Sequence, residues 1–225
     1  MTAVAEPRQP RIIRRVIRQW PTATRTVLVD TDQGEGYLKA IGGDPTGPHT
    51  LACEWVGTQL ARWIGLRTFD FALIKVTEED EIPLAGGDLA IPGLGFITRA
   101  ERGAPWGGKV SELRRLANPE DIIRLVVFDT WTLNCDRYFP PRRPNRDNVF
   151  LSREGAPPKQ FILKAIDHTH CFTCGRELSR RVSNIAHIKD RHGLTDYSLS
   201  SRVTWSPRGT CSEKSYAISS NVCGS

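Results

Sequence analysis

The stretch NPEDIIRLVVFDTWTLNCDRYF, residues 118–139, decides the fold because it combines an apolar helix with a carboxylate at the helix end. Asn118 is a favourable N-cap residue, Pro119 suits the first helical turn, and Asp121 occupies the capping-box position. The residues that follow are mostly aliphatic, so we expect this helix to lie in the core. The sequence therefore predicts that Asp136 lies at the mouth of a buried helix.

Two more polar residues follow at the ends of a predicted hairpin. Asn148 directly precedes the apolar strand 149–151, and Asp167 directly follows the apolar run 161–166. A Gly-Ala-Pro-Pro turn at 155–158 joins the two strands. Together with the carboxylate at the helix end, these residues suit a Mg²⁺–phosphate site, because Mg²⁺ prefers hard oxygen ligands.

The composition is that of a globular protein large enough for one core or one two-lobed domain. The chain has 225 residues, of which 39% are hydrophobic and 25% charged. No apolar run approaches the ~20 residues that span a bilayer, and the N-terminus lacks an apolar signal core. We therefore expect a cytoplasmic protein with no membrane partner. The net charge of +6 favours anionic partners without choosing among nucleotides, acidic proteins and nucleic acid.

The N-terminal part of the chain predicts a small sheet. Apolar or alternating runs that read as strands occur at 26–29, 36–40, 69–76 and 95–98. Turn residues at 30–35 make the first two strands a hairpin. Residues 11–20 carry apolar side chains at both helical and strand spacing, so the pattern leaves strand and helix open.

One amphipathic helix is predicted within this sheet region, at residues 50–65. Its expected apolar stripe consists of Leu51, Trp55, Leu60 and Ile64. Gly65 is expected at the C-terminal cap. Glu54 lies in the first turn, where a carboxylate interacts favourably with the helix dipole.

Three short motifs resemble the catalytic core of HipA-like kinases, in particular the short stand-alone ones, which are distant relatives of protein kinases and type II phosphatidylinositol 4-kinases. The motifs are Asn134-Cys135-Asp136-Arg137, Asp147-Asn148-Val149 and Ile166-Asp167-His168. The resemblance implies that Asp136 is the catalytic-loop aspartate, and that Asn148 and Asp167 bind the metal.

The spacing of these motifs departs from the usual pattern in one place. Eleven residues lie between Asp136 and Asn148, whereas a protein-kinase catalytic loop has about four. Asn145 is an alternative metal ligand. We prefer Asn148 because it directly precedes a strand.

The same resemblance assigns roles in the N-terminal part. Lys39 becomes the lysine that binds the nucleotide phosphates, Glu54 its ion-pair partner, and the backbone of residues 97–100 the hinge that meets adenine. Without the resemblance, Lys39 would be an ordinary solvent-facing strand lysine. Gly34 and Gly36 form at most a weak phosphate-binding signal, because the full glycine-rich pattern is missing.

The implied fold class is α+β, a protein-kinase-like two-lobed fold with a small N-lobe sheet plus helix and a short helical C-lobe. The expected boundaries are a disordered N-terminus at 1–10, an N-lobe at 11–98, a C-lobe at 104–192 and a Ser-rich, poorly ordered tail at 193–225. The implied activity is ATP- and Mg²⁺-dependent phosphoryl transfer to a Ser or Thr hydroxyl of a protein substrate, with no requirement for nucleic acid.

Two other functions stay open from the sequence. A nucleotide-binding pseudokinase is favoured by residues 195–225, which do not resemble the helical continuation expected of a complete C-lobe. A zinc-stabilised nucleic-acid-binding module would use the N-terminal arginines and a His/Cys cluster. That cluster comprises Cys171, Cys174, His168, His170, His187 and His192. It has only one CxxC pair. The resemblance to a metal-binding motif at Asp167 explains the segment better, because it also explains why the segment follows an apolar strand.

Overall fold

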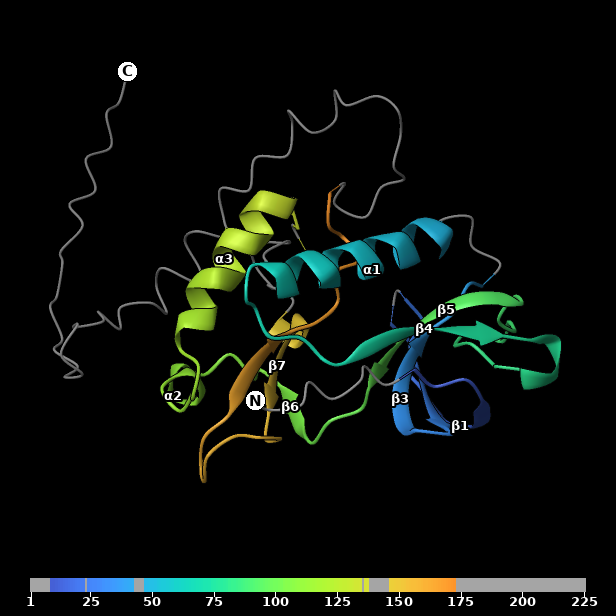
Figure 1. Ribbon diagram of the computed structural model, residues 1–225, viewed down its shortest axis with the longest axis horizontal. Coiled ribbons are helices and arrows are strands. Elements are labelled where there is room, and N and C mark those ends of the chain that lie inside the picture. Colours follow the sequence, from blue (N-terminus) through green and yellow to red (C-terminus); the bar gives the residue numbers. More distant parts are fainter. Residues whose placement is uncertain (1–8, 23, 43–46, 135, 138–145, 173–225) are drawn as a thin grey trace, which may run out of the picture.

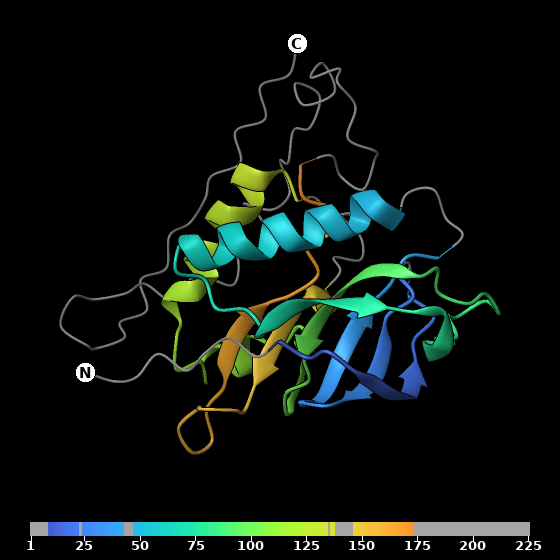
Figure 2. The same cartoon turned by 45° about the vertical axis from the view of Figure 1, so that its right-hand side comes forward.

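The computed structural model describes residues 9–22, 24–42, 47–134, 136–137 and 146–172. Within these residues the chain forms two antiparallel sheets, and the two longer helices lie along one side of them (Figure 1). Figure 2 shows the longer helix, α1 (Gly47–Trp63), running above both sheets and beside α3 (Glu120–Thr132). This mixed architecture confirms the predicted α+β, kinase-like fold class.

The larger sheet forms the N-terminal lobe and has the strand order β1-β2-β3-β5-β4. Its strands are β1 (Ile13–Gln19), β2 (Val27–Thr31), β3 (Gly34–Lys39), β4 (Phe71–Val76) and β5 (Gly93–Arg99). One short 3-10 turn, η1 (Glu78–Asp80), follows β4. The sheet buries alternating aliphatic side chains, among them Val27, Val29, Leu38, Ile74 and Ile97. The segment at 11–20, which the sequence left undecided, is therefore an edge strand.

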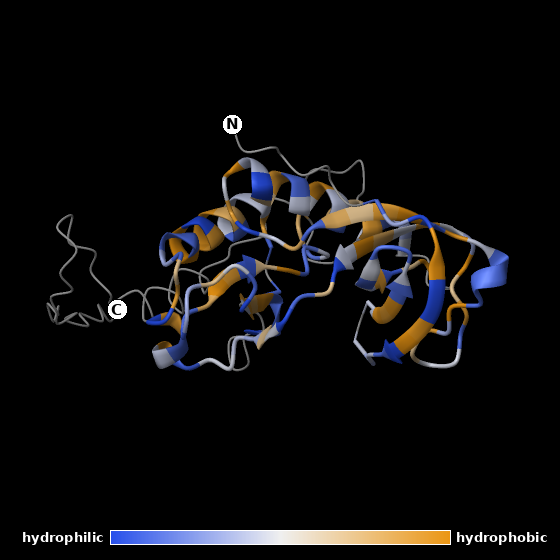
Figure 3. Cartoon of the chain, turned by 60° about the horizontal axis from the view of Figure 1, so that its bottom comes forward, coloured by the Kyte–Doolittle hydropathy of each residue, from blue (hydrophilic) through white to orange (hydrophobic). Residues whose placement is uncertain are grey.

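The second lobe combines helices with a three-stranded sheet of order β6-β7-β8. Its strands are β6 (Gly103–Pro105), β7 (Val149–Ser152) and β8 (Ile162–Ala165), and its remaining helical segments are α2 (Val110–Leu113) and η2 (Arg146–Asn148). Its core joins the end of α1 and helix α3 to the β7–β8 hairpin through Ala61, Leu125, Phe128, Val149 and Leu163. In Figure 3, apolar residues occur on both long helices and on the strands beneath them.

The predicted helix at 50–65 is present as α1, but its predicted apolar stripe is not its fully buried face. Leu51, Trp55, Leu60 and Ile64 are only partly buried. The fully buried residues of α1 are instead Cys53, Glu54, Gly57, Thr58 and Ala61. A Cβ on Gly57 would lie 2.7 Å from the Cβ of His168, so glycine permits a close approach there. The helix thus packs through small and polar side chains. Gly65 follows the last turn with a φ of +82°, as the predicted C-terminal cap requires.

Strand β6 pairs with β7 in the second lobe, and Gly103 is needed there because a Cβ would collide with the carbonyl oxygen of Leu151. One local prediction in this lobe was also wrong. Pro119, rather than Asn118, occupies the cap position of α3. The Asn118 amide instead bonds to both backbone groups of Leu163, with distances of 2.8 and 2.9 Å. Asn118 therefore connects the start of α3 to strand β8.

The connection between the lobes is held by polar contacts to the β7–β8 hairpin. Arg99, the last residue of β5, forms an ion pair of 2.9 Å with Glu154. The buried carboxylate of Glu101 accepts hydrogen bonds from Ser152 Oγ, at 2.6 Å, and from Lys164 Nζ. These contacts fix the second lobe relative to the strand that leaves the first sheet.

Candidate active site

A cavity of about 310 Å³ lies where the two lobes meet. Its aromatic lining comprises Trp20, Tyr37, Phe69, Phe96 and Phe150. Its polar lining includes Lys39, Glu54, Asp147, Asn148 and Asp167. Four of the five residues predicted for the site therefore border one cavity, and the fifth, Asp136, is hydrogen-bonded to Asn148.

Lys39 lies at the end of β3, opposite Phe96 of β5, and its side chain is buried. Its Nζ donates to Oε1 of Glu54, which comes from α1, and to Oδ1 of Asp167, at 3.0 Å. Only 9% of Lys39 is exposed, so the alternative of a solvent-facing strand lysine is wrong. One ammonium group thus lies between two carboxylates from different lobes.

This charge arrangement separates the pKa values of the two carboxylates. Burial raises the pKa of Glu54 to about 7, because desolvation outweighs the attraction of Lys39 and because Asp167 adds a second negative charge. Burial also acts to raise the pKa of Asp167, but the Lys39 charge and hydrogen bond outweigh it and hold that pKa well below its usual value. The pKa of Lys39 is raised despite burial, because both carboxylates favour its charged form. Asp167 is therefore the firmly ionised carboxylate of this group.

Asp167 follows β8 with an unusual backbone conformation. Its φ is +57°, in the left-handed region that few residues other than glycine adopt. Thr169 Oγ1 donates to Asp167 Oδ1 at 2.8 Å and helps to hold the carboxylate toward Lys39. Such conformations persist where surrounding contacts enforce them, and they occur often at active sites.

Asp136 and Asn148 come together despite the longer spacing between them. The Asn148 Nδ2 donates to Asp136 Oδ2 at 2.5 Å, and His170 Nδ1 lies 3.5 Å from the same oxygen. Burial acts to raise the pKa of Asp136, but the hydrogen bonds from His170 and Asn148 and the His170 charge leave it below its usual value. Asp136 is thus ionised at neutral pH. The alternative ligand, Asn145, lies outside the described residues.

The His/Cys residues that suggested zinc point in different directions where the structure describes them. His168 Nδ1 contacts Thr58 Oγ1 at 3.2 Å, and its ring packs against Phe128. The Cys171 thiol faces Thr132, whereas His170 faces Asp136. Within the described ranges, no three His, Cys, Asp or Glu side chains gather as a metal site. Cys174, His187 and His192 lie outside these ranges.

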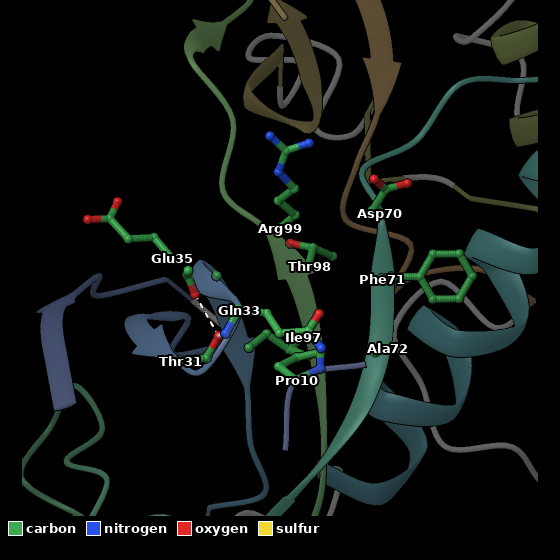
Figure 4. Close-up of a pocket in the computed structure, with 12 residues that line it drawn as sticks. Pro10, Thr31, Gln33, Glu35, Asp70, Phe71, Ala72, Ile97, Thr98 and Arg99 are labelled. Atoms are coloured by element: carbon green, nitrogen blue, oxygen red, sulfur yellow. Dashed lines mark hydrogen bonds between the residues drawn. The ribbon is translucent and has the colours of Figure 1, made fainter. Parts of the chain in front are cut away.

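The weak glycine signal of the first hairpin belongs to a different pocket. Gly34 and Gly36 line a hollow of only about 30 Å³, next to Pro10, Asp70 and Arg99 (Figure 4). A Cβ on Gly36 would lie 2.8 Å from Ile97 Cδ1, so this glycine allows β3 to pack on β5. Neither glycine lines the cavity beside Lys39.

A family model for HipA-like kinases matches residues 11–202. The chain belongs to the HipA-like kinase family. The match begins where the N-lobe was predicted to begin, and it includes residues 193–202 of the predicted tail, which the structure does not describe. No curated protein matches the chain at a significant level. No helix among the described residues is both long and apolar enough to cross a membrane.

Membership of a kinase family makes Mg²⁺ and ATP the groups to test against this site. Asp167 supplies an ionised carboxylate. The Asn148 side chain donates through Nδ2, and its amide oxygen is the atom that could bind a cation. Hard oxygen donors of this kind fit Mg²⁺, which keeps several waters and shares phosphate oxygens. Lys39 beside them fits an anionic phosphate, and the aromatic lining fits a base. The residues present therefore fit both groups.

Sequence reasoning missed a buried ion pair directly behind these residues. Arg137 Nη1 donates to Asp129 Oδ1, and neither side chain is exposed. Asn134 Nδ2 also donates to Asp129 Oδ1, at 3.1 Å. The available signal was Asp129 itself, a charged residue that directly follows the apolar run 125–128 of α3. A carboxylate in that position needs a buried partner.

Proposed function

We propose that this HipA-like kinase transfers the γ-phosphoryl group of ATP, with Mg²⁺, to a Ser or Thr hydroxyl of a protein substrate. The observation that carries the proposal is that Lys39, held by Glu54, meets Asp167 in the cavity that Asn148 also borders. Asp136 is hydrogen-bonded to Asn148 beside that cavity. Phosphoryl transfer needs little covalent chemistry from the protein. It needs charge stabilisation and positioning of the kind that these groups supply.

Each side chain has a distinct task in this proposal. Lys39 binds the nucleotide phosphates, and Glu54 holds the lysine in place from α1. Asn148 and Asp167 hold Mg²⁺, which neutralises charge on the phosphates when it is bound. Asp136 accepts a hydrogen bond from the acceptor hydroxyl. Its lowered pKa makes it a weak base, so orientation of the hydroxyl is its main contribution.

The proposal is tested by incubating the protein with γ-labelled ATP, Mg²⁺ and candidate protein substrates. Asp136→Asn should keep nucleotide binding and lose transfer by about 10²–10⁴-fold, the usual contribution of such a group. Asp70→Asn is the matched control, because Asp70 is an exposed carboxylate outside the cavity. Equal transfer by the parent and Asp136→Asn would refute the assignment.

The same samples separate the other two candidate functions. Mg²⁺-dependent ATP binding with no transfer to any protein, including the kinase itself, would favour the pseudokinase. Stoichiometric zinc in metal analysis of the purified protein would favour the zinc-stabilised module.

A further inference from the structure

Arg137 is a buried charged residue that lies directly beside the site and donates to three acceptors among the described residues. Its Nη1 donates to Asp129 Oδ1, its Nε to the carbonyl oxygen of Asn148 at 3.2 Å, and its Nη2 to that of Ile166 at 2.6 Å. Its side chain is fully buried. Moving a guanidinium group out of water is costly, and hydrogen bonds offset that cost only when their geometry is good. The guanidinium and its acceptors therefore hold one another in place.

The two carbonyl groups that Arg137 binds belong to the peptide units next to the proposed metal ligands. The Asn148 carbonyl begins the peptide unit that leads into β7, and the Ile166 carbonyl belongs to the peptide unit that enters Asp167. Each peptide unit is planar, so a hydrogen bond to its oxygen orients the whole unit. Ile166 N also donates to the Asn148 oxygen at 3.2 Å, which ties the two segments directly.

The consequence is clearest at Asp167. With the preceding peptide plane held by Arg137, the φ of +57° decides where the Asp167 carboxylate points. Loss of that hydrogen bond would let the residue relax toward the common region of φ, because the left-handed conformation is unfavourable for residues with a Cβ. The carboxylate would then leave its position between Lys39 and Thr169.

We infer that Arg137 is a positioning residue that sets the distance and orientation of Asn148 and Asp167 toward the metal, with Asp129 as its anchor. This inference rests on the proposed function, because it takes Asn148 and Asp167 to be the metal ligands. Outer partners that orient metal ligands typically change metal affinity by about 10–100-fold when they are replaced.

The variant Arg137→Lys distinguishes this positioning role from an effect of the positive charge alone. A lysine keeps the positive charge for Asp129, but its compact ammonium group cannot reproduce a planar fork that reaches three acceptors. Arg124→Lys is the matched control. Arg124 lies on α3 and pairs with the buried Asp121 of the same helix, at 2.5 Å. Within the described ranges, it contacts neither the segment that carries Asn148 nor the segment that carries Asp167.

The test measures uptake of Mn²⁺, as a spectroscopic substitute for Mg²⁺, by electron paramagnetic resonance in the presence of a non-hydrolysable ATP analogue. Arg137→Lys should weaken Mn²⁺ binding by about 10–100-fold. Binding of the analogue without metal should change much less than Mn²⁺ binding, because Lys39, its partner Glu54 and the aromatic lining are all retained in this variant. Arg124→Lys should retain the parental Mn²⁺ affinity.

The outcomes distinguish failure of this inference from failure of the proposed function. A parent protein that takes up no Mn²⁺ with the analogue overturns the proposed metal site, and this inference with it. A parent that binds Mn²⁺ together with a folded Arg137→Lys of equal affinity overturns only the positioning role.

A second variant covers the case in which Arg137→Lys does not fold. The double variant Arg137→Gln/Asp129→Asn removes both charges, so no buried charge is left without its partner. One amide cannot span both carbonyl groups, so the double variant should show the same selective loss of Mn²⁺ affinity. Parental Mn²⁺ affinity in the folded double variant would also overturn the inference.

Discussion

Replacing Lys39 by Met removes the buried cation that lies between Glu54 and Asp167, and the structure predicts how much stability is lost. Removing one partner of a buried ion pair typically costs ~3–5 kcal/mol. Here the loss should fall near the lower end, at roughly 2–4 kcal/mol, because Glu54, with a pKa of about 7, takes up a proton in place of the lost charge. Asp167 carries most of the loss, since Lys39 is what lowers its pKa.

The loss should depend on pH in a defined direction. The lowered pKa of Asp167 stabilises the folded parent at every pH above about 3.8, the pKa of this carboxyl in the unfolded chain. This contribution is lost as the pH falls through the lower pKa of the folded state. The raised pKa of Glu54 stabilises the folded state below 4.5, and that contribution is lost as the pH rises through about 7. Without Lys39, Glu54 resists ionisation further, so the gap between Lys39→Met and the parent should widen from acidic to alkaline pH.

Thermal unfolding followed by circular dichroism, without nucleotide, measures this gap. A loss of roughly 2–4 kcal/mol corresponds to a Tm about 5–15 °C lower for a chain of this size. Lys75→Met is the control, because Lys75 is an exposed lysine on β4. Lys39→Met/Asp167→Asn should recover most of the loss. Either of two results would contradict this prediction. One is a Tm of Lys39→Met equal to that of Lys75→Met. The other is a stability difference between Lys39→Met and the parent that is the same at about pH 5 and about pH 8.

Two further predictions concern the metal and the C-terminal segment. Asp167→Ala should keep the fold and lose the Mg²⁺-dependent part of the thermal shift given by ATP, because this carboxylate is the proposed charged metal ligand; a full Mg²⁺-dependent shift would contradict that role. Deleting everything after Thr195 should leave Tm and ATP binding nearly unchanged, because the segment lacks the apolar periodicity that offsets ~1–2 kcal/mol of ordering entropy per residue. Strong hydrogen-exchange protection at Tyr197–Trp205 would show instead that this segment is part of the core.

The sequence predicted those parts of the fold in which side-chain period and chemistry agree. The alternation along Phe71–Val76 and the turn before Gly34 predicted strands correctly, because one face of the sheet is buried. The approach of Lys39, Glu54 and Asp167 needed the family resemblance, because residues so far apart in sequence carry no local signal of contact.

The incorrect predictions have a common physical cause, which is that polar partners replaced apolar burial. The buried face of α1 could not be found from hydrophobicity, because Glu54 turns inward to Lys39 and Thr58 to His168. In the same way, Asn118 bonds to the backbone of β8, although its sequence context favours a helix cap. Arg137 was overlooked because its partners are mainly backbone carbonyl groups, which every sequence possesses.

The hydrogen bond between Asp136 and Asn148 also explains how a long spacing can bring these two residues together. The bond, at 2.5 Å, joins the residues that flank the eleven-residue connection, and Arg137 donates to the Asn148 carbonyl oxygen at 3.2 Å. Both contacts involve only residues at the two ends of the connection. The relative position of Asp136 and Asn148 therefore follows from these end contacts and does not require the spacing of about four residues found in a protein-kinase catalytic loop. The number of residues between two motifs is thus a weak criterion for whether they belong to one site.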